Sequence, residues 1–253
     1  MRVGRFVQWL FVFLAIATAA GADEPKKLLL IGQTRDNHPP RTHEYMMGLE
    51  RLAGLLEPVA NLQVTLLKAD EPWPEGPQQL ADADGVVLFL TQGAAWCQAD
   101  PRRFDAISRL AQRGGGIVGL HWAIGAKPAE PIPAFLQLLG GCHGGPDRKY
   151  QVVETDVHIA EGAHPITAGL HDFRVHDEFY YQLKFVSPSD TIRPILQVTL
   201  DGSPQTVAWT YERPDGGRSF GFSGLHFHDN LQREEYCTFL KRAVLWSVKL
   251  PTE

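Results

Sequence analysis

The chain is poor in cysteine and has no run of basic residues, and both absences narrow its function. Its 253 residues include three cysteines, Cys97, Cys142 and Cys237, none in a CxxC or other metal-binding spacing. Three cysteines cannot all pair within one chain; one disulfide is possible in an oxidising compartment, but the sequence does not indicate which. The formal net charge of −5 predicts a mildly acidic surface and argues against a nucleic-acid partner.

Long apolar runs are also missing, except at the start of the chain. Arg2 and Arg5 flank the beginning of an apolar stretch over 6–17, and the small residues of 20–22 form a typical cleavage site. The stretch is short for a membrane span. We therefore expect a signal peptide over 1–22, no integral membrane span after its removal, and a periplasmic or secreted domain over 23–253. An uncleaved N-terminal anchor is the alternative.

The first half of the chain alternates apolar strands with helices. Strands are expected over 27–32, 62–67, 85–91 and 117–120, and helices over 42–57 and 101–112. Thr42 is a possible cap of the first helix, Pro101 suits the first turn of the second, and 71–77 is expected to be a Pro-rich connection. This pattern predicts an α/β fold with a mainly parallel sheet flanked by helices. The ligand site of such a sheet lies outside the carboxyl ends of its strands.

From about Lys149 the chain changes to short β-like runs separated by turns. These runs cover 150–157, 173–175, 192–200, 206–211 and 219–223. A final helix is expected over 233–248, capped by Asp229 or Asn230. We therefore predict extra β elements in the C-terminal half of one domain, without internal repeats.

Histidines are abundant and gather where the predicted strands end. The chain has ten of them, of which those near strand ends are His38, His43, His121, His143, His176, His226 and His228. Imidazole in such places suits metal ligation or proton transfer near neutral pH, whereas a single histidine is more often structural. His158, His164 and His171 are expected to be structural or exposed.

The segment Gly119-Leu120-His121-Trp122-Ala123 follows an apolar strand and has the form of a nucleophile elbow. Such a turn displays one side chain at the edge of the sheet and needs small neighbours. The displayed residue is His121, which can bind a metal or move a proton but does not readily replace serine or cysteine in acyl transfer. A hydrogen bond from His121 to a neighbouring loop is the structural alternative.

Two later segments place further polar groups beside aromatic residues. If residues 176–181 are extended, Asp177 and Glu178 point to opposite faces, so only one of them can face the site. A solvated acidic pair is an equally good interpretation of this segment alone. In an extended segment His226 and His228 would share a face, as paired metal ligands do.

Taken together, these motifs resemble those of the trehalose-utilisation, or ThuA-like, family of the class I glutamine amidotransferase-like superfamily. The similarity runs from about Lys27 to Val248. The segments that carry it are 114–121, His164-Pro165-Ile166-Thr167, Asp177-Glu178-Phe179-Tyr180, Gly224-Leu225-His226 and the terminal Leu245-Trp246.

The resemblance implies a flavodoxin-like sheet and the convergence of His43, His121, Glu178 and His226. True amidotransferases carry cysteine at the turn where this chain has His121, so glutaminase activity is not expected. Leu225 departs from the pattern, since a smaller, glycine-like residue is expected there.

The resemblance also implies a substrate class, because the family is associated with the metabolism of trehalose and related sugars, including keto-sugars. We therefore expect an exported, metal-dependent enzyme that isomerises, epimerises or hydrolyses a sugar or keto-sugar in carbohydrate catabolism. His43, His121 and His226 would hold a divalent ion such as zinc, manganese or nickel, with His121 and His226 also catalytic and Glu178 as acid–base group or fourth ligand. No nucleotide cofactor is expected, and an oligomer is possible. The residues expected to contact the carbohydrate are Trp122, Tyr180 and His228.

Two other classes of function remain open from the sequence. A non-catalytic carbohydrate-binding protein would use the same pocket without a metal. A cysteine hydrolase or amidotransferase would use Cys97, which follows the third predicted strand, or Cys142.

Overall fold

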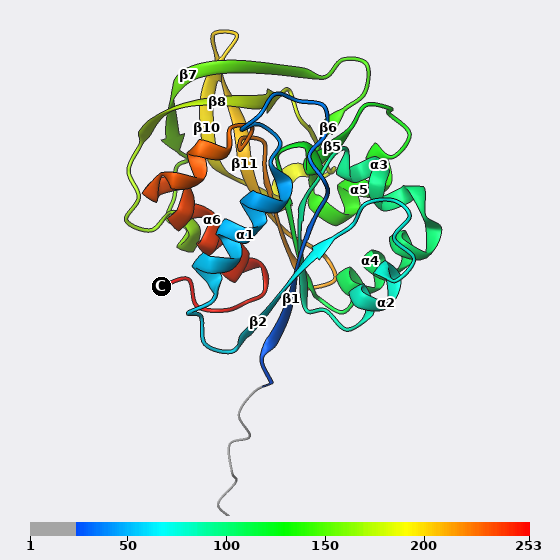
Figure 1. The fold of residues 1–253 in the computed structure, drawn as a ribbon. Helices are drawn as coiled ribbons and strands as arrows, with labels where there is room; N and C mark the ends of the chain where they lie inside the picture. Colours follow the sequence, from blue (N-terminus) through cyan, green and yellow to red (C-terminus); the bar gives the residue numbers. More distant parts are fainter. Residues whose placement is uncertain (1–23) are drawn as a thin grey trace, which may run out of the picture.

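The computed structural model describes residues 24–253, and its centre is a nine-stranded sheet of order β2-β1-β3-β4-β12-β11-β10-β7-β8 (Figure 1). The predicted signal peptide over 1–22 lies outside the described residues. In the described part of the chain, no helix is long and apolar enough to cross a membrane.

Five neighbouring strands of the sheet are parallel. They are β1 (Lys26–Gly32), β2 (Leu62–Lys68), β3 (Gly85–Phe89), β4 (Gly116–Leu120) and β12 (Arg218–Phe222). The order 2-1-3-4, with β12 in fifth place, is the flavodoxin-like order, in which the chain changes direction across the sheet between β1 and β3. The carboxyl ends of these strands therefore form the expected ligand-binding edge.

The other four strands are antiparallel and extend the sheet. They are β7 (Lys149–Ile159), β8 (Phe173–Tyr181), β10 (Ile192–Leu200) and β11 (Ser203–Glu212). In Figure 1, β7 and β8 cross over the upper end of the molecule, where the parallel strands finish. A small second sheet is made of β5 (Gly125–Ala126), β6 (Gly141–Gly144) and β9 (Lys184–Phe185).

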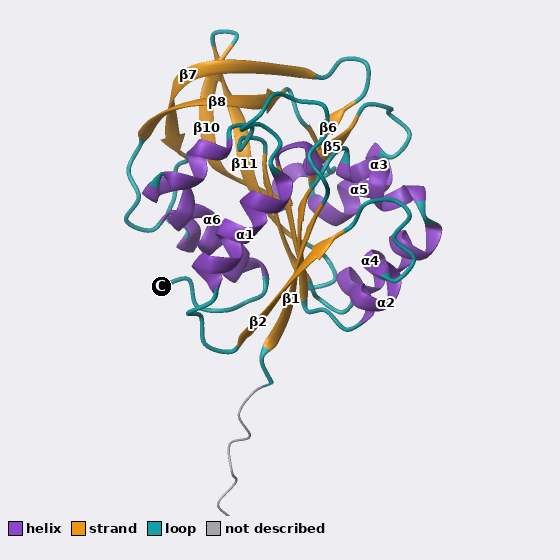
Figure 2. Cartoon of the chain, in the orientation of Figure 1, coloured by secondary structure: helices purple, strands orange, loops and turns teal. Residues whose placement is uncertain are grey.

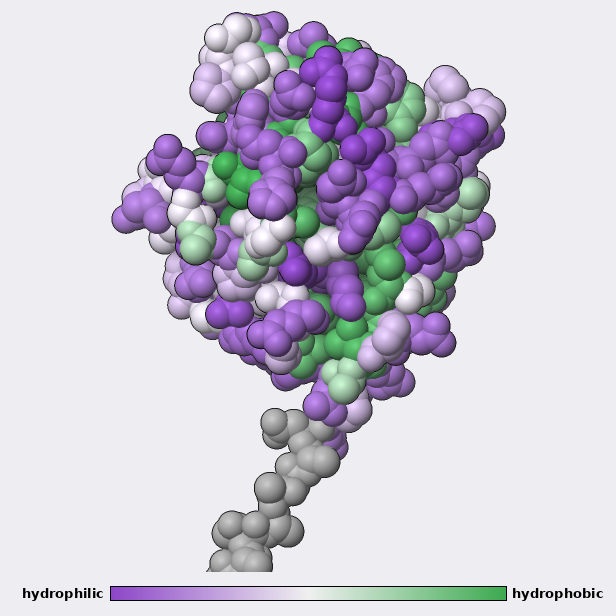
Figure 3. Space-filling model, turned by 90° about the vertical axis from the view of Figure 1, so that its left-hand side faces the viewer, coloured by the Kyte–Doolittle hydropathy of each residue, from purple (hydrophilic) through white to green (hydrophobic). Residues whose placement is uncertain are grey.

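Helices cover both faces of the sheet (Figure 2). One face carries α1 (Tyr45–Leu56) and α6 (Glu234–Ser247). The other carries α2 (Gly76–Ala81), α3 (Gly93–Ala99), α4 (Pro101–Gln112) and α5 (Ile132–Leu139). Leu28 and Leu30 of β1 pack on the first side, and Leu29 and Ile31 pack on the second, as expected of a strand buried on both faces. Viewed from the side of α1 and α6, the outer surface is mostly hydrophilic (Figure 3).

The predicted fold class is confirmed, and α4 has the predicted bounds. Helices α2, α3 and α5 were not predicted from the sequence. The first two have six and seven residues, too few for a helical repeat of apolar positions to stand out, and α2 begins within the stretch expected to be a Pro-rich connection.

Both predicted side-chain caps are wrong. Helix α1 begins at Tyr45, and the hydroxyl of Thr42 instead donates to the Pro39 carbonyl at 2.6 Å. A 3₁₀ turn over His228–Gln232 precedes α6, so Asp229 and Asn230 lie too early to cap it. Asp229 pairs with Arg41, and the Asn230 amide donates to the His176 carbonyl at 3.0 Å.

Candidate functional site

His121 lies on a sharp turn directly after β4. The residue opens a 3₁₀ turn over His121–Ile124 with φ of +49°, a left-handed conformation that non-glycine residues rarely adopt. A Cβ on Gly119 would come within 2.9 Å of the Leu139 side chain, which would have to shift, so a small residue fits best before the turn. The predicted elbow is therefore present, and it places a fully buried imidazole at the carboxyl edge of the sheet.

His43 reaches the same point from the loop between β1 and α1. Its Nδ1 lies 2.8 Å from Oδ2 of Asp36 and 2.9 Å from the Tyr45 hydroxyl. A carboxylate behind an imidazole holds the ring in place and leaves the other nitrogen available to a ligand. That other nitrogen, Nε2, lies 3.0 Å from Nε2 of His121.

His226 enters from the segment after β12, and backbone contacts fix it beside His43. The His43 N–H donates to the His226 carbonyl at 3.2 Å, and Thr42 forms an isolated β-bridge with Phe227. Leu225 has φ of +85°, which explains why a glycine-like residue is expected there. The structure nevertheless accommodates leucine at this position, because its side chain is buried in the same core cluster as the apolar residues of α6.

Asp177 and Glu178 of β8 lie on opposite faces, as predicted for an extended segment. The buried Asp177 carboxylate accepts the backbone N–H groups of Leu225 and His226, at 2.7 and 3.0 Å, and the Tyr236 hydroxyl at 2.8 Å. Oε1 of Glu178 lies 3.8 Å from His121 Nε2 and 3.7 Å from His226 Nδ1. Asp177 therefore positions the backbone, and Glu178 faces the histidines.

The four groups His43, His121, Glu178 and His226 offer ligand atoms within 4.8 Å of one another. Nδ1 of His121 lies 3.0 Å from the Ser223 carbonyl, which can only accept a hydrogen bond, so the proton is on Nδ1 and the Nε2 lone pair faces inward. The Tyr180 hydroxyl and His226 Nδ1 lie 3.0 and 3.2 Å from that Nε2. The Tyr180 hydroxyl can donate its proton to this Nε2.

Burial keeps these imidazoles neutral. Burial lowers the pKa of His121 well below its ordinary value, with the neighbouring His43 and His226 adding to the effect. Burial likewise lowers the pKa of His43, although Asp36 opposes it, and lowers that of His226 to about 4. Burial and the nearby Asp177 raise the pKa of Glu178 to about 7. Neutral imidazole is the form that ligates metal ions.

A cavity of about 250 Å³ opens beside these groups. Its volume is below the roughly 300–1,000 Å³ of sites for drug-sized ligands, so it suits a small molecule. A wider hollow of about 620 Å³ lies beside Lys26 and Asp84, near the amino ends of the strands, and no histidine is among the residues lining it. The residues lining the smaller cavity are His38, His43, Trp122, Lys127, His143, Arg148, Tyr150, Glu178 and Tyr180.

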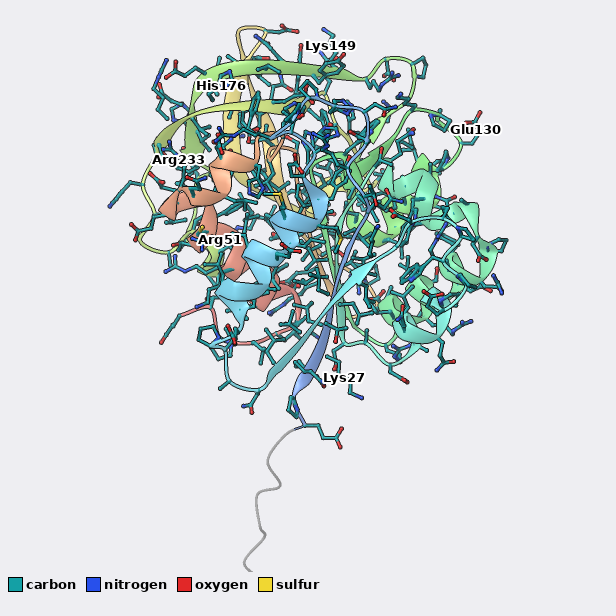
Figure 4. The ribbon with its side chains drawn as sticks, in the orientation of Figure 1. Lys27, Arg51, Glu130, Lys149, His176 and Arg233 are labelled. Atoms are coloured by element: carbon teal, nitrogen blue, oxygen red, sulfur yellow. The ribbon has the colours of Figure 1, made fainter. Side chains whose placement is uncertain are left out.

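Two of the three residues predicted to contact a carbohydrate line the cavity, and the third does not. Trp122 and Tyr180 line the cavity, and His143 stacks on Tyr180 with ring centroids 4.1 Å apart. His228 begins the 3₁₀ turn before α6, outside the residues that line the cavity. His176 is exposed on the outer side of β8, stacked on Phe227, and does not join the cluster (Figure 4).

The cysteines have no access to this chemistry. Cys97 and Cys142 are buried, and burial raises the pKa of each thiol to about 12, which keeps both protonated. All three cysteines are free in the described part of the chain. These environments argue against a cysteine nucleophile.

Sequence reasoning missed the supporting groups around the cluster. Asp36 and Tyr45 hold His43, and Lys127, Arg148 and Tyr150 lie around the cavity. Asp36 belongs to a loop without periodicity, although its position after the first strand was a usable signal. Tyr45 is the first residue of α1, Lys127 follows β5, Arg148 directly precedes β7 and Tyr150 lies near its start, so only the folded chain brings them together.

The fold and the site together define an α/β protein with an imidazole cluster at the carboxyl edge of its parallel strands. The chain belongs to the ThuA family, described as trehalose utilisation, whose model matches residues 21–247. No curated protein matches the sequence.

Solved structures with a similar fold include two ThuA-like proteins. The protein from Parabacteroides merdae is 19% identical, with a TM-score of 0.69 over 91% of this chain and 92% of the other. The protein from Bacteroides uniformis is 17% identical, with a TM-score of 0.67 over 91% and 94%. A cytoplasmic protein from Salmonella typhimurium is 17% identical, with a TM-score of 0.61 over 88% and 99%. These similarities show the fold.

Proposed function

We propose that the chain is a metal-dependent enzyme that moves protons on a sugar or keto-sugar in carbohydrate catabolism. The observation that carries this proposal is the convergence of three buried imidazoles and one carboxylate at the sheet edge. His43, His121 and His226 would hold a divalent cation such as zinc, manganese or nickel. Such an ion supplies Lewis-acid polarisation of a sugar carbonyl or of water.

The residues present fit a cation because their polar atoms are already arranged for one. Asp36 behind His43 and the Ser223 carbonyl behind His121 turn two Nε2 atoms toward the same point. Outer partners of this kind orient ligating histidines and are typical of metal sites. Three imidazoles and an open position form a common catalytic zinc arrangement, with Glu178 as an available fourth group.

The cavity residues support a carbohydrate as substrate. Trp122, Tyr150 and Tyr180 present aromatic surface, and Glu178 is the one carboxylate among the residues lining the cavity. In isomerisation or epimerisation, Glu178 would take a proton from the substrate and return it. In hydrolysis, where water attacks the sugar, the same carboxylate would act as the acid–base group. Burial keeps the Tyr180 hydroxyl protonated by raising its pKa. With an ion on His121 Nε2, this hydroxyl would be free to donate to a substrate oxygen.

We also propose that the protein is exported. The arginine-flanked apolar stretch and the small residues of 20–22 support this, because they follow the pattern of a signal peptide. N-terminal sequencing of the protein recovered from a bacterial periplasm, starting at or near Asp23, would support export. An intact N-terminus in the cytoplasm would contradict it.

The test of the metal site is the metal content of the purified chain, measured by elemental analysis after incubation with zinc, manganese and nickel. We expect close to one equivalent in the wild type and in the control His176→Ala, whose side chain is exposed away from the cluster. His121→Ala should lose the metal. Asp36→Asn, which keeps all three ligands, should bind it roughly 10- to 100-fold more weakly.

Circular dichroism of each variant separates loss of the site from loss of the fold, and Asp36→Asn keeps the test valid if His121→Ala does not fold. A wild type without metal under all three conditions would contradict the proposal. Glu178→Gln should abolish turnover of a keto-sugar in metal-loaded protein; full turnover would exclude the acid–base role.

A further inference from the structure

Two cationic side chains lie around the cavity without a carboxylate partner. Lys127 follows β5, and Arg148 lies in the turn between β6 and β7; both line the cavity. Neither forms an ion pair with any residue in the described part of the chain. Two neighbouring lysines are paired, Lys149 with Asp201 at 3.2 Å and Lys184 with Asp147 at 2.9 Å.

The acidic residue nearest to Arg148 in the sequence already forms an ion pair with another residue. Asp147, beside Arg148, pairs with Lys184 at 2.9 Å, and the same Lys184 ammonium donates to the Gly144 carbonyl at 2.7 Å. The guanidinium of Arg148 donates from Nη1 to the Gly145 carbonyl at 3.2 Å. A planar guanidinium has five N–H donors, so several remain available to a ligand.

The charges that face the cavity from the other elements do not neutralise these cations. Burial, Arg148 and Lys184 lower the pKa of His143 to about 3, so this ring stays neutral. Glu178 lies with the histidine cluster, 3.8 Å from His121 and 3.7 Å from His226. The chain as a whole is acidic, with a formal charge of −5, so the two cations beside this cavity have the opposite sign to the net charge.

We infer that the site takes an anionic carbohydrate, whose carboxylate or phosphate group is bound by Arg148 and Lys127. The sugar ring lies against the aromatic side chains that line the cavity, Trp122, Tyr150 and Tyr180. This inference rests on the proposed function for the position of the ring, and it adds the charge of the substrate. Arginine forms paired hydrogen bonds to both carboxylate and phosphate oxygens, and lysine adds a point charge. A neutral sugar would leave both cations without a counter-ion.

The test is calorimetric titration of the purified full chain with glucose, glucuronate and glucose 6-phosphate. Each titration is done as purified and again after removal of metals with a chelator, so that coordination of the anion by a metal is separated from binding by the cations. We expect at least one anion to bind about tenfold or more tightly than glucose. The two anions distinguish a carboxylate from a phosphate as the preferred group.

The variants identify the residues responsible. Arg148→Met should weaken anion binding about tenfold and leave glucose binding unchanged, and Lys127→Met should have a smaller effect of the same kind. Lys149→Met is the matched control, because this neighbouring lysine projects from the start of β7 and pairs outside the cavity (Figure 4). The preference should also weaken as salt is added.

Several results would overturn the inference. Glucose binding as tightly as both anions would do so, as would a loss in Arg148→Met no larger than that in Lys149→Met. Failure of every sugar to bind with a Kd below about 1 mM would also overturn it. Metal content of the same samples keeps the two proposals apart: an anion preference without metal contradicts only the metal enzyme, and metal without the preference contradicts only this inference.

Discussion

The parallel and antiparallel halves of the sheet meet at the site but are held to it by different interactions. In the parallel half, every residue of β3 is buried, and strands pack through apolar side chains on both faces. In the antiparallel half, most of β7 is at least partly exposed, and β8 reaches the site through the buried carboxylate of Asp177. Apolar packing thus positions His121, and buried polar contacts position Glu178 and His226.

The comparison predicts that one isosteric polar change in the antiparallel half has the largest effect. Asp177→Asn replaces an oxygen that accepts buried donors by an NH₂ group that cannot. We expect the free energy of unfolding to fall by about 3 kcal/mol, because buried N–H and O–H donors lose their acceptor. Denaturant unfolding followed by circular dichroism measures it.

Asp172→Asn is the control, because Asp172 is exposed and accepts from His158 and the Ile159 N–H at the surface. It should cost far less. If Asp177→Asn and Asp172→Asn lose equal stability, then buried polar contacts do not hold the antiparallel half to the site.

The second prediction concerns stability at acid pH, to which the segment connecting β7 to β8 should contribute. His164 is buried against Trp246, and its Nδ1 accepts the Ile166 N–H at 3.2 Å. Burial, together with Arg193 and Arg218, lowers its pKa from 6.5 to about 4. The unfolded chain therefore takes up the proton first, so this contribution is complete above pH 6.5 and is lost as the pH falls toward 4.

The loss amounts to about 3 kcal/mol at most, from 1.36 kcal/mol per pKa unit. Unfolding free energies measured at pH 7 and pH 4.5 should therefore differ less in His164→Asn than in the wild type. Parallel curves for the wild type and His164→Asn would contradict the assignment.

The third prediction tests packing in the parallel half with two glycines of α1. A Cβ on Gly48 would lie 2.6 Å from the Phe89 ring, whereas one on Gly54 meets no atom within 4 Å. Gly48→Ala should lower the free energy of unfolding by about 1–3 kcal/mol through overpacking. Gly54→Ala should raise it by about 1 kcal/mol, because alanine favours the helix.

Each variant serves as the control for the other, since both make the same change in the same helix. Thermal unfolding monitored at 222 nm, with denaturant titration, gives both values. Effects of the same sign would show that helix propensity or a general property of α1, and not contact with β3, decides the outcome.

The difference between the halves also decides what the sequence could predict. The strands of the parallel half were found within about two residues, because continuous apolar runs follow directly from burial on both faces. The strand predicted over 173–175 continues to Tyr181, since His176, Asp177 and Glu178 interrupt its apolar pattern. Their polarity belongs to the site, and only the tertiary structure explains why a strand contains them.

The same holds within the candidate site. The convergence of His43, His121, Glu178 and His226 was expected from the resemblance to the ThuA-like family, and the structure brings these four together. His226 and His228 were predicted to share a face if their segment is extended. The chain instead enters a 3₁₀ helix at His228, and only His226 joins the cluster. Asp36 and Arg148 come from irregular turns, where no periodic pattern indicates which way a side chain points.

The distances along the chain between the clustered histidines have a consequence for unfolding. His43 and His121 are 78 residues apart, and His121 and His226 are 105 apart. An ion bound to all three would cross-link the chain and close two long loops, which reduces the freedom of the unfolded state only while the ion stays attached. The metal would then be a reversible cross-link between the segments that follow β1, β4 and β12. A chelator would therefore lower the free energy of unfolding of the whole domain as well as empty the site.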